Sequence, residues 1–481
     1  MDLRPILYIV GIFLSILAFS MSLPMAVDLY YGNPDWKVFF ACIMATAFFG
    51  GTLTLTNASD KGFQITVRQA FLLTTLSWLA VALFAALPLW FCYMDLSFTD
   101  AFFEAMSGIT TTGSTVIINL DDAPPGILLW RAILQWLGGI GIIIMALSVL
   151  PFLKVGGMQL FRAESSESEK ALPRAAKLAS SIAYIYLFLT ALCTFFYHQA
   201  GLSLFDSVAH AMTTISTGGF STFDTSFAGF DTAWIEITAI IFMILGSLPF
   251  VLYLKGVQGN WKALLTDSQV RWFLSIVAIS TLTLFFYVIR ITELPESEAL
   301  RRAMFNVVSV MTGTGYTSAD YGLWGMFAIS LLFFLMVVGG CAGSTTCGIK
   351  IFRFQVLYSV ANTQIKKLLH PHGVFIPHYN NKPLADDIPI AVMSFFFLYA
   401  LCFALLAIAL SFIGLDFLTA MSGAATSISN VGPGLGNVIG PTGTFAPLPD
   451  SAKWVLCVGM LLGRLELFTV LVMLSPHFWR R

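Results

Sequence analysis

The chain carries one short pattern of Thr, Ser and Gly four times, as Thr110-Thr111-Thr112-Gly113, Ser216-Thr217-Gly218-Gly219, Thr312-Gly313-Thr314-Gly315 and Ser429-Asn430-Val431-Gly432. We call these four-residue stretches the elbows. Each elbow follows an apolar segment of about a dozen residues, too short for a span, which needs about 20. We predict that these segments are re-entrant half-helices at Phe98–Ile109, Leu204–Ile215, Ala299–Met311 and Phe417–Ile428.

The composition indicates an integral membrane protein. Of the 481 residues, 57% are hydrophobic and only 11% are charged, whereas soluble domains carry about 25% charged residues. The seven cysteines form no Cys-x-x-Cys pair, so we interpret them as small buried hydrophobic residues. The apolar run after Arg4 lacks a small-residue cleavage site, so we expect a retained first span.

Ten segments are predicted to span the membrane. They are Pro5–Leu23, Val38–Leu55, Gln69–Phe91, Ile127–Leu153, Leu178–Tyr197, Trp234–Leu254, Trp272–Ile291, Leu323–Phe352, Ile388–Ile413 and Trp454–Leu474. The last eight spans group with the elbows into four copies of span, half-helix, elbow and span. The predicted fold is therefore an all-α integral membrane protein, with four pseudo-symmetric repeats around a central pore. The predicted boundaries are 1–66 for two extra N-terminal spans and 67–165, 166–265, 266–380 and 381–481 for the repeats.

The charges predict an orientation. With both termini in the cytoplasm, most of the 25 Lys and Arg residues fall on the inner side, as the positive-inside rule requires. The outer side, on which the elbows open, then collects acidic residues that would concentrate cations. Any single one could instead cap a helix or solvate a loop. These residues are Asp95, Asp100, Asp121, Asp122, Asp206, Asp224, Asp231, Glu293, Glu296, Glu298, Asp320, Asp416 and Asp450.

The elbows are suited to binding a cation. Irregular backbone at membrane depth survives only where it is buried in protein or lines a water-filled cavity. Glycine permits close approach of the backbone, and the C-terminal end of a half-helix favours a positive charge. Stacked rings of carbonyl oxygens replace the hydration shell of potassium in known filters. We therefore predict a potassium pore lined by the elbow residues; the alternative is that small residues only let helices pack closely.

At this point the chain resembles the bacterial Trk/Ktr/HKT superfamily of potassium transporters, and most closely the membrane subunit of the Trk system. The resemblance covers essentially the whole length, including the two extra N-terminal spans. Besides the elbows it rests on Gln135-Trp136-Leu137-Gly138-Gly139-Ile140-Gly141, Gly156-Gly157-Met158-Gln159-Leu160, Gly339-Gly340-Cys341-Ala342-Gly343-Ser344, Asn430-Val431-Gly432-Pro433-Gly434-Leu435-Gly436 and Gly463-Arg464-Leu465-Glu466.

The resemblance implies potassium uptake across the bacterial inner membrane. It further implies a homodimer and a cytosolic, TrkA-like nucleotide-binding regulatory subunit. In the family the glycines that match Gly113, Gly219, Gly315 and Gly432 form the narrowest filter ring. In the second repeat Gly218 is adjacent, and equal spacing from Asp100 and Asp206 favours Gly219. The fourth elbow lacks threonine, so we expect an asymmetric filter that is less strict against sodium.

Two features are candidate gates. The eighth span is interrupted by Gly339-Gly340-Cys341-Ala342-Gly343-Ser344-Thr345-Thr346-Cys347-Gly348, and each glycine costs a helix up to about 1 kcal/mol relative to alanine. In the family this intramembrane loop is the gate, and the alternative is a glycine kink used for packing. Arg464 lies in the middle of the last span, where arginine costs roughly 2.5–3.5 kcal/mol. The resemblance places it below the filter; the alternative is an ion pair with Glu466 or Glu104.

Several other residues have predicted roles. We expect Lys350 to reach the cytoplasmic interface and His210 and Asn306 to support the filter from behind. The segments Lys154–Lys177 and Lys350–Pro389 are the predicted docking surface for the regulatory partner.

Other functions receive less support. The main alternative is a symporter coupled to protons or sodium, since such carriers also use broken helices; its two halves are usually inverted, whereas these repeats share one orientation. No metalloprotease, nucleophile-elbow or Walker motif is present, so we predict no enzyme activity. The expected ligand is potassium as substrate, with membrane lipid around the spans, no covalently bound cofactor and no nucleic acid.

Overall fold

The computed structural model describes residues 1–59, 65–148, 171–230, 232–380 and 382–480. Helices dominate this part of the chain, and the strands described in it are one short antiparallel pair, β1 (His378–Tyr379) and β2 (Lys382–Pro383). The motif at 156–160 and most of the segment Lys154–Lys177 lie outside the described residues. All seven cysteines are buried and free, which confirms their interpretation as apolar packing residues.

The N-terminal spans form a hairpin outside the repeats. It consists of α1 (Arg4–Ser20), α2 (Ser22–Tyr31) and α3 (Trp36–Asn57). Helix α1 packs along α3 and also contacts α4 of the first repeat. Close packing depends on two glycines, because a Cβ atom at Gly11 would lie 2.8 Å from the Gly50 carbonyl oxygen, and one at Gly50 would lie 2.9 Å from the Ser15 nitrogen.

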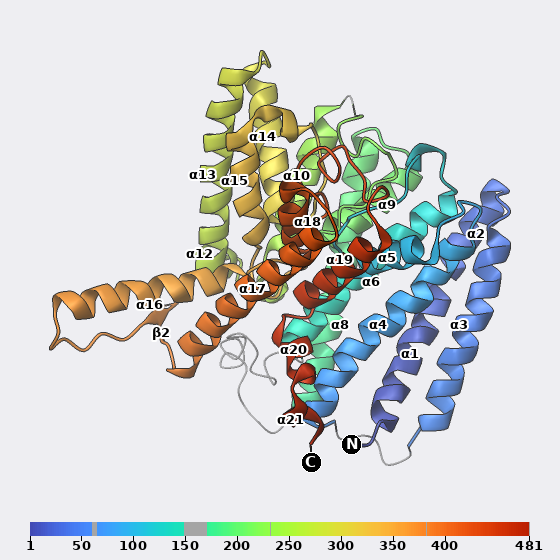
Figure 1. Ribbon diagram of the computed structural model, residues 1–481, viewed down its shortest axis with the longest axis horizontal. Helices are drawn as coiled ribbons and strands as arrows, with labels where there is room; N and C mark the ends of the chain where they lie inside the picture. Colours follow the sequence, from blue (N-terminus) through green and yellow to red (C-terminus); the bar gives the residue numbers. More distant parts are fainter. Residues whose placement is uncertain (60–64, 149–170, 231, 381, 481) are drawn as a thin grey trace.

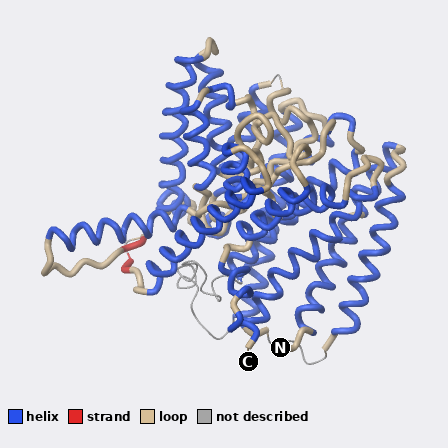
Figure 2. Tube along the Cα trace, in the orientation of Figure 1, coloured by secondary structure: helices blue, strands red, loops and turns tan. Residues whose placement is uncertain are grey.

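The four repeats begin with the same pair of helices. The long first helices are α4 (Val67–Phe91), α8 (Ala171–Gln199), α13 (Ser268–Ile291) and α17 (Asp387–Phe412). The half-helices are α5 (Phe98–Ile109), α9 (Leu204–Ile215), α14 (Glu296–Met311) and α18 (Phe417–Ser429). Each half-helix packs against the long helix before it, and the predicted half-helix bounds agree with the structure to within three residues. Many of the non-helical segments gather in one region of the molecule (Figure 2).

Three of the four half-helices start where the sequence offers a side-chain cap. Ser97 accepts a hydrogen bond from the Asp100 amide, Ser203 from the Asp206 amide, and Asp416 from the Thr419 amide. Such caps satisfy amides that the first turn leaves free. Asp100 and Asp206 thus occupy the same place in two repeats, which explains their equal spacing from the elbows.

The second helices of the repeats differ from the prediction. The first repeat has an unbroken α6 (Pro125–Ser148), whereas α10 (Ala233–Ser247) and α11 (Phe250–Val257) meet at 91°, and α19 (Asp450–Arg464) and α20 (Phe468–Leu474) at 114°. The predicted spans Trp234–Leu254 and Trp454–Leu474 are therefore each broken by a bend and are not single straight helices. Pro249 explains the first bend, because proline lacks an amide donor and restrains the residue before it.

The third repeat is the most interrupted. Its second helix consists of α15 (Met326–Val337), the irregular stretch 338–350 and α16 (Ile351–Leu369), as the glycines predicted. In the described residues, seven helices are long and apolar enough to cross a membrane, or nine if each bent pair counts as one span. The remaining short helices are η1 (Leu120–Asp122), α12 (Lys262–Thr266), η3 (Tyr321–Trp324) and α21 (Pro476–Trp479).

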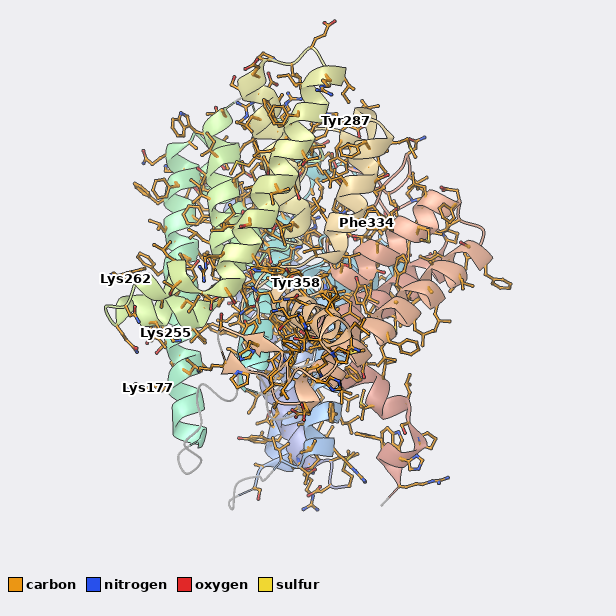
Figure 3. The ribbon with its side chains drawn as sticks, turned by 90° about the vertical axis from the view of Figure 1, so that its left-hand side faces the viewer. Lys177, Lys255, Lys262, Tyr287, Phe334 and Tyr358 are labelled. Atoms are coloured by element: carbon orange, nitrogen blue, oxygen red, sulfur yellow. The ribbon has the colours of Figure 1, made fainter. Side chains whose placement is uncertain are left out.

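The predicted loop Lys350–Pro389 contains α16 and the β1–β2 pair, which project together from one side of the molecule (Figure 1). Both termini lie at the same end of the molecule (Figure 1). Lys177, Lys255 and Lys262 lie nearer to that end than Tyr287, which lies near the opposite end (Figure 3). This distribution is consistent with the orientation expected from the positive-inside rule.

The α1–α3 contact yields a stability prediction. Gly50→Ala should lower the free energy of unfolding by about 1–3 kcal/mol, because a Cβ there meets backbone atoms that cannot give way. The adjacent Gly51 is a matched control, since a Cβ there meets nothing within 4 Å, and alanine is the better helix former. Thermal unfolding of the detergent-purified variants checks this, and equal melting temperatures for the two would contradict it.

Candidate ion-conduction site

The four elbows share one backbone conformation. The second position has a left-handed φ in every elbow: 52° at Thr111, 51° at Thr217, 72° at Gly313 and 52° at Asn430. The fourth position does too: 84° at Gly113, 81° at Gly219, 82° at Gly315 and 106° at Gly432. Since this conformation is unfavourable for residues with a Cβ atom, its repetition indicates one geometry in all four copies. It matches Gly219, and not Gly218, with the other three glycines.

The elbows close into a ring. A Cβ atom added to each fourth-position glycine would collide with, or closely approach, the third-position carbonyl oxygen of the next repeat. The distance from the added Cβ to the carbonyl oxygen is 2.2 Å from Gly113 to Gly218, 1.7 Å from Gly219 to Thr314, 2.0 Å from Gly315 to Val431 and 3.0 Å from Gly432 to Thr112. The order runs through all four repeats and returns to the first. The same four glycines line one cavity together with Asp224.

The half-helices end at this ring. Helices α5, α9 and α14 lead directly into their elbows, and α18 includes the first residue of its elbow. Their C-terminal ends therefore surround the ring, and the partial negative charge of each end favours a cation. The second helices approach closely because Gly138 and Gly463 lie against the carbonyls of Ile109 and Ile428.

The segment after each elbow is tied back to its half-helix. The tie comes from the residue six positions before the elbow in three repeats. Glu104 Oε2 accepts from the Val116 amide at 2.9 Å, His210 Nε2 lies 3.1 Å from Ser221 Oγ, and Asn306 Nδ2 donates to Ser318 Oγ at 3.1 Å. In the fourth repeat this position is Gly423, and the neighbouring Ser422 hydroxyl accepts from the Leu435 amide at 2.9 Å.

These ties place His210 and Asn306 behind the elbows, where the sequence predicted them. Glu104 was missed as their counterpart, although its equal spacing from the first elbow was a usable signal. It is completely buried and pairs with Arg131 at 2.8 Å. A buried pair of this kind satisfies both charges, so each side chain depends on the other.

The glycine-rich stretch 339–348 lies beneath the ring and is buried except at Gly348, which is partly exposed. We call it the intramembrane loop. The Thr345 hydroxyl accepts from the Thr217 hydroxyl at 3.2 Å, and Cys347 Sγ lies 3.8 Å from Thr111 Oγ1. The loop therefore contacts the second positions of two elbows from below.

The intramembrane loop also fills the bend of α10. The amides of Cys341 and Thr345 donate to the carbonyls of Ser247 and Gly246 at 3.1 and 3.2 Å. A third contact comes from α13, where Gln269 Oε1 accepts from the Ala342 amide at 2.9 Å. Three contacts from two helices thus hold the loop in place.

Arg464 is bound to the intramembrane loop. Its guanidinium donates to the carbonyl of Thr345 at 3.2 Å, to Cys347 Sγ at 2.6 Å and to the carbonyl of Gly138 at 2.8 Å. Its side chain is almost completely buried. The expected place beside the loop agrees with the structure.

The alternative ion pairs of Arg464 are wrong in the described structure. Glu466 pairs with Arg353, and Glu104 pairs with Arg131. Glu466 has a left-handed φ of 62° at the bend between α19 and α20, so its side chain leaves the direction of α19. This bend has no proline or glycine to predict it.

Lys350 also differs from its prediction. We expected it to extend to the membrane interface, but it is buried and donates to the carbonyl and hydroxyl of Thr346. The hydroxyl contact measures 3.2 Å. Because the loop turns back on itself before α16, the amine reaches loop oxygens rather than water.

Comparisons with known proteins agree with this architecture. Residues 36–481 match the family model described as TrkH, cation transport protein. The chain is 47% identical to the Trk system potassium uptake protein TrkI of Halomonas elongata, covering 99% of this chain and 97% of the relative. It is 37% identical to the Trk system potassium uptake protein TrkH of Escherichia coli over the full length of both.

A solved structure has the same fold. The crystal structure of the potassium transporter TrkH from Vibrio parahaemolyticus superposes with a TM-score of 0.92 at 34% sequence identity, and the match covers all of both chains. Both the family match and the identities extend across the half-helices, the elbows and the broken helices. The chain belongs to the TrkH family of cation transport proteins.

Proposed function

We propose that this chain takes up potassium across the bacterial inner membrane through the elbow ring, which acts as its selectivity filter. The observation that carries the proposal is the cyclic approach of each ring glycine to the next repeat's carbonyl. Such a ring can replace the water around a dehydrated cation. The names of the relatives, potassium uptake proteins of Trk systems, support potassium as the substrate. As a member of a transport family, the chain is not an enzyme.

The filter in this proposal consists of the backbone of all sixteen elbow residues named above. The hydroxyls contribute chiefly by holding the backbone. The hydroxyls of Thr110 and Thr112 form a hydrogen bond with an Oγ1–Oγ1 distance of 2.7 Å, and those of Thr312 and Thr314 form one of the same length. In the fourth elbow Asn430 Nδ2 donates instead to Thr112 Oγ1 at 2.9 Å. The fourth elbow thus uses a contact of its own, which supports an asymmetric filter.

The outer mouth supplies a negative field. Asp224 lines the cavity above the ring, and its Oδ1 accepts from the Leu120 amide at 3.0 Å. Slight desolvation and the adjacent Asp224 carboxylate raise the pKa of Asp121. The charge of Asp121 is therefore lost earlier than usual as the pH falls, and the attraction for cations weakens with it.

The gate in this proposal is the intramembrane loop together with Arg464. The loop blocks the path below the ring, and the fixed positive charge of Arg464 repels a passing cation. Regulation by a cytosolic nucleotide-binding partner and assembly as a homodimer remain part of the proposal. The projecting unit of α16 and the β1–β2 pair offers a surface for that partner, and the phrase "Trk system" in the relatives' names supports further components.

The second candidate is a symporter coupled to protons or sodium. The broken helices of the second, third and fourth repeats favour it, since carriers bind ions at such breaks. Rubidium and sodium flux into liposomes, with and without an imposed proton gradient, separates the two functions. Rubidium flux that needs no gradient of a second ion supports the pore.

The ring yields a selectivity prediction. Gly113→Ser should lower the ratio of rubidium to sodium flux by about tenfold, a change of about 1.4 kcal/mol. The new Cβ would lie 2.2 Å from the Gly218 carbonyl, so the ring must widen. Gly201→Ser is the matched control, because Gly201 has a similarly positive φ of 110° but nothing within 4 Å of a Cβ. An unchanged flux ratio in the Gly113 variant would count against the filter.

The gate yields a second prediction. A positive charge about 10 Å from a cation raises its energy by roughly 1.7 kcal/mol at an effective dielectric constant of about 20. Arg464→Ala should therefore raise basal rubidium flux by about tenfold. Arg464→Lys, which keeps the charge, should raise it less, and Arg271→Ala, at the exposed start of α13, should leave it unchanged. Wild-type flux in Arg464→Ala would remove this residue as a barrier.

A further inference from the structure

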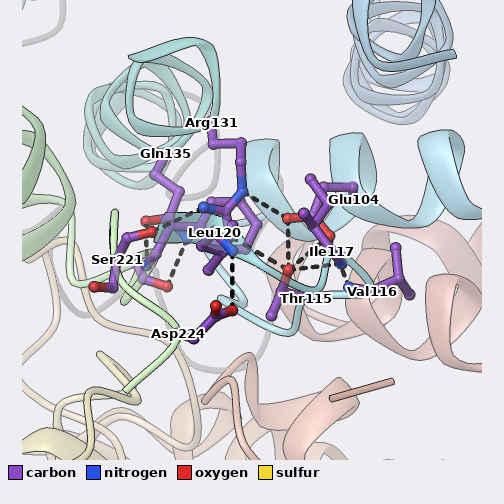
Figure 4. Close-up of polar contacts among 11 residues, drawn as sticks. Glu104, Thr115, Val116, Ile117, Leu120, Arg131, Gln135, Ser221 and Asp224 are labelled. Atoms are coloured by element: carbon purple, nitrogen blue, oxygen red, sulfur yellow. Dashed lines mark hydrogen bonds and ion pairs between the residues drawn. The ribbon is translucent and has the colours of Figure 1, made fainter. Parts of the chain in front are cut away.

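Helix α6 contacts the second elbow through Gln135 (Figure 4). Its Nε2 donates to the Gly218 carbonyl at 2.6 Å, and its Oε1 accepts from the Phe220 amide at 3.0 Å. The two contacts lie on either side of the ring glycine Gly219. Gln135 is completely buried, so bulk water does not compete for these hydrogen bonds.

The contact with Phe220 determines the direction of a ring carbonyl. The Gly219 carbonyl and the Phe220 N–H belong to one planar trans peptide unit, in which they point in opposite directions. Gln135 holds the N–H towards α6, outside the ring. The Gly219 carbonyl is therefore turned away from α6, towards the inside of the ring, and rotation of this peptide would break the hydrogen bond.

Arg131 extends the contact along the same segment. Its Nη1 donates to the Ser221 carbonyl at 2.8 Å, and its guanidinium lies 4.1 Å from the centre of the Phe220 ring. Its Nε pairs with Glu104 at 2.8 Å. Because Glu104 also holds the segment after the first elbow, the ion pair joins the exits of two neighbouring elbows (Figure 4).

The equivalent helices of two other repeats lack these groups. Gly138 of α6, Gly246 of α10 and Gly463 of α19 each lie against the last carbonyl region of a half-helix. The position three residues before these glycines holds Gln135 in α6, Met243 in α10 and Met460 in α19. The position seven residues before them holds Arg131, Ala239 and Leu456 in the same order. Methionine, alanine and leucine side chains cannot donate such hydrogen bonds. The polar contact is therefore particular to α6 among these three helices.

We infer that Gln135 is a positioning residue for ion selection. It holds the Gly219 peptide in the orientation that presents its carbonyl to the ion, and the Arg131–Glu104 pair anchors the segment that follows. The inference rests on the proposed potassium function. It adds that selectivity depends on a side chain of α6 that touches no ion.

The test variant is Gln135→Met, which introduces the residue that α10 and α19 already carry at this place. Purified variants are reconstituted in liposomes, and rubidium and sodium influx are measured separately. The rubidium-to-sodium ratio should fall about tenfold, since two buried hydrogen bonds are lost and the peptide is free to rotate. The wild type should melt at a higher temperature in potassium chloride than in sodium chloride. This difference should be smaller in Gln135→Met.

Two further variants make the test specific. Trp136→Phe removes the 3.1 Å hydrogen bond to Thr190 Oγ1 from the same helix but not from the elbow, so its flux ratio should equal that of the wild type. Gln135→Glu keeps an acceptor for the Phe220 amide but not the amide donor to Gly218, and should give an intermediate ratio. If Gln135→Met does not purify, Gln135→Ala takes its place, and an unchanged ratio in that variant overturns the inference.

The outcomes separate this inference from the proposed function. A wild-type protein that does not prefer rubidium over sodium overturns the proposed function, and the inference with it. A selective wild type with an equally selective Gln135→Met overturns the inference alone. A Gln135→Met variant that loses both fluxes in equal proportion, together with melting temperature, shows a merely structural role and also overturns it.

Discussion

The fold depends on one constraint: backbone polar groups at membrane depth need partners other than lipid. The four elbows place irregular backbone there, and no elbow could remain in that position alone. Each ring glycine makes room for the carbonyl of the next repeat, so the four copies create a shared polar interior. The half-helices, their outer caps and the close approach of the second helices all serve to bring the elbows to this ring.

The ring is symmetric in its backbone but not in its support. Glu104, His210 and Asn306 occupy one position and make one kind of contact, yet they differ in charge and hydrogen-bonding capacity. The fourth repeat replaces the side chain by Gly423 and uses Ser422. A duplicated architecture therefore fixes where each elbow lies, while separate side chains determine how firmly each elbow is held.

The sequence predicted the features that depend on local composition and repetition. The elbows, the half-helices and the glycine-rich interruption carry their own signals, and the structure has them at the expected residues. The bend at Pro249 also had a signal, but the hydropathy of the surrounding residues concealed it. The bend at Glu466 had none, because the side chain of Glu466 pairs with the distant Arg353. The buried position of Lys350 had none either, because the path of the irregular loop places the amine beside the Thr346 oxygens. Ion pairing between Glu104 and Arg131 is likewise a property of the packed repeats.

The bend in α10 and the intramembrane loop satisfy each other. The bend frees the carbonyls of Gly246 and Ser247 from their helix, and the loop amides of Thr345 and Cys341 take them up. If the loop moves in gating, as we propose, these four groups must find water or new partners, because unpaired polar groups are costly. Arg464 is bound to the carbonyl of Thr345, so loop and charge cannot separate without a further unpaired group. In the proposed gate, entry of water and withdrawal of the positive charge are therefore expected in one step.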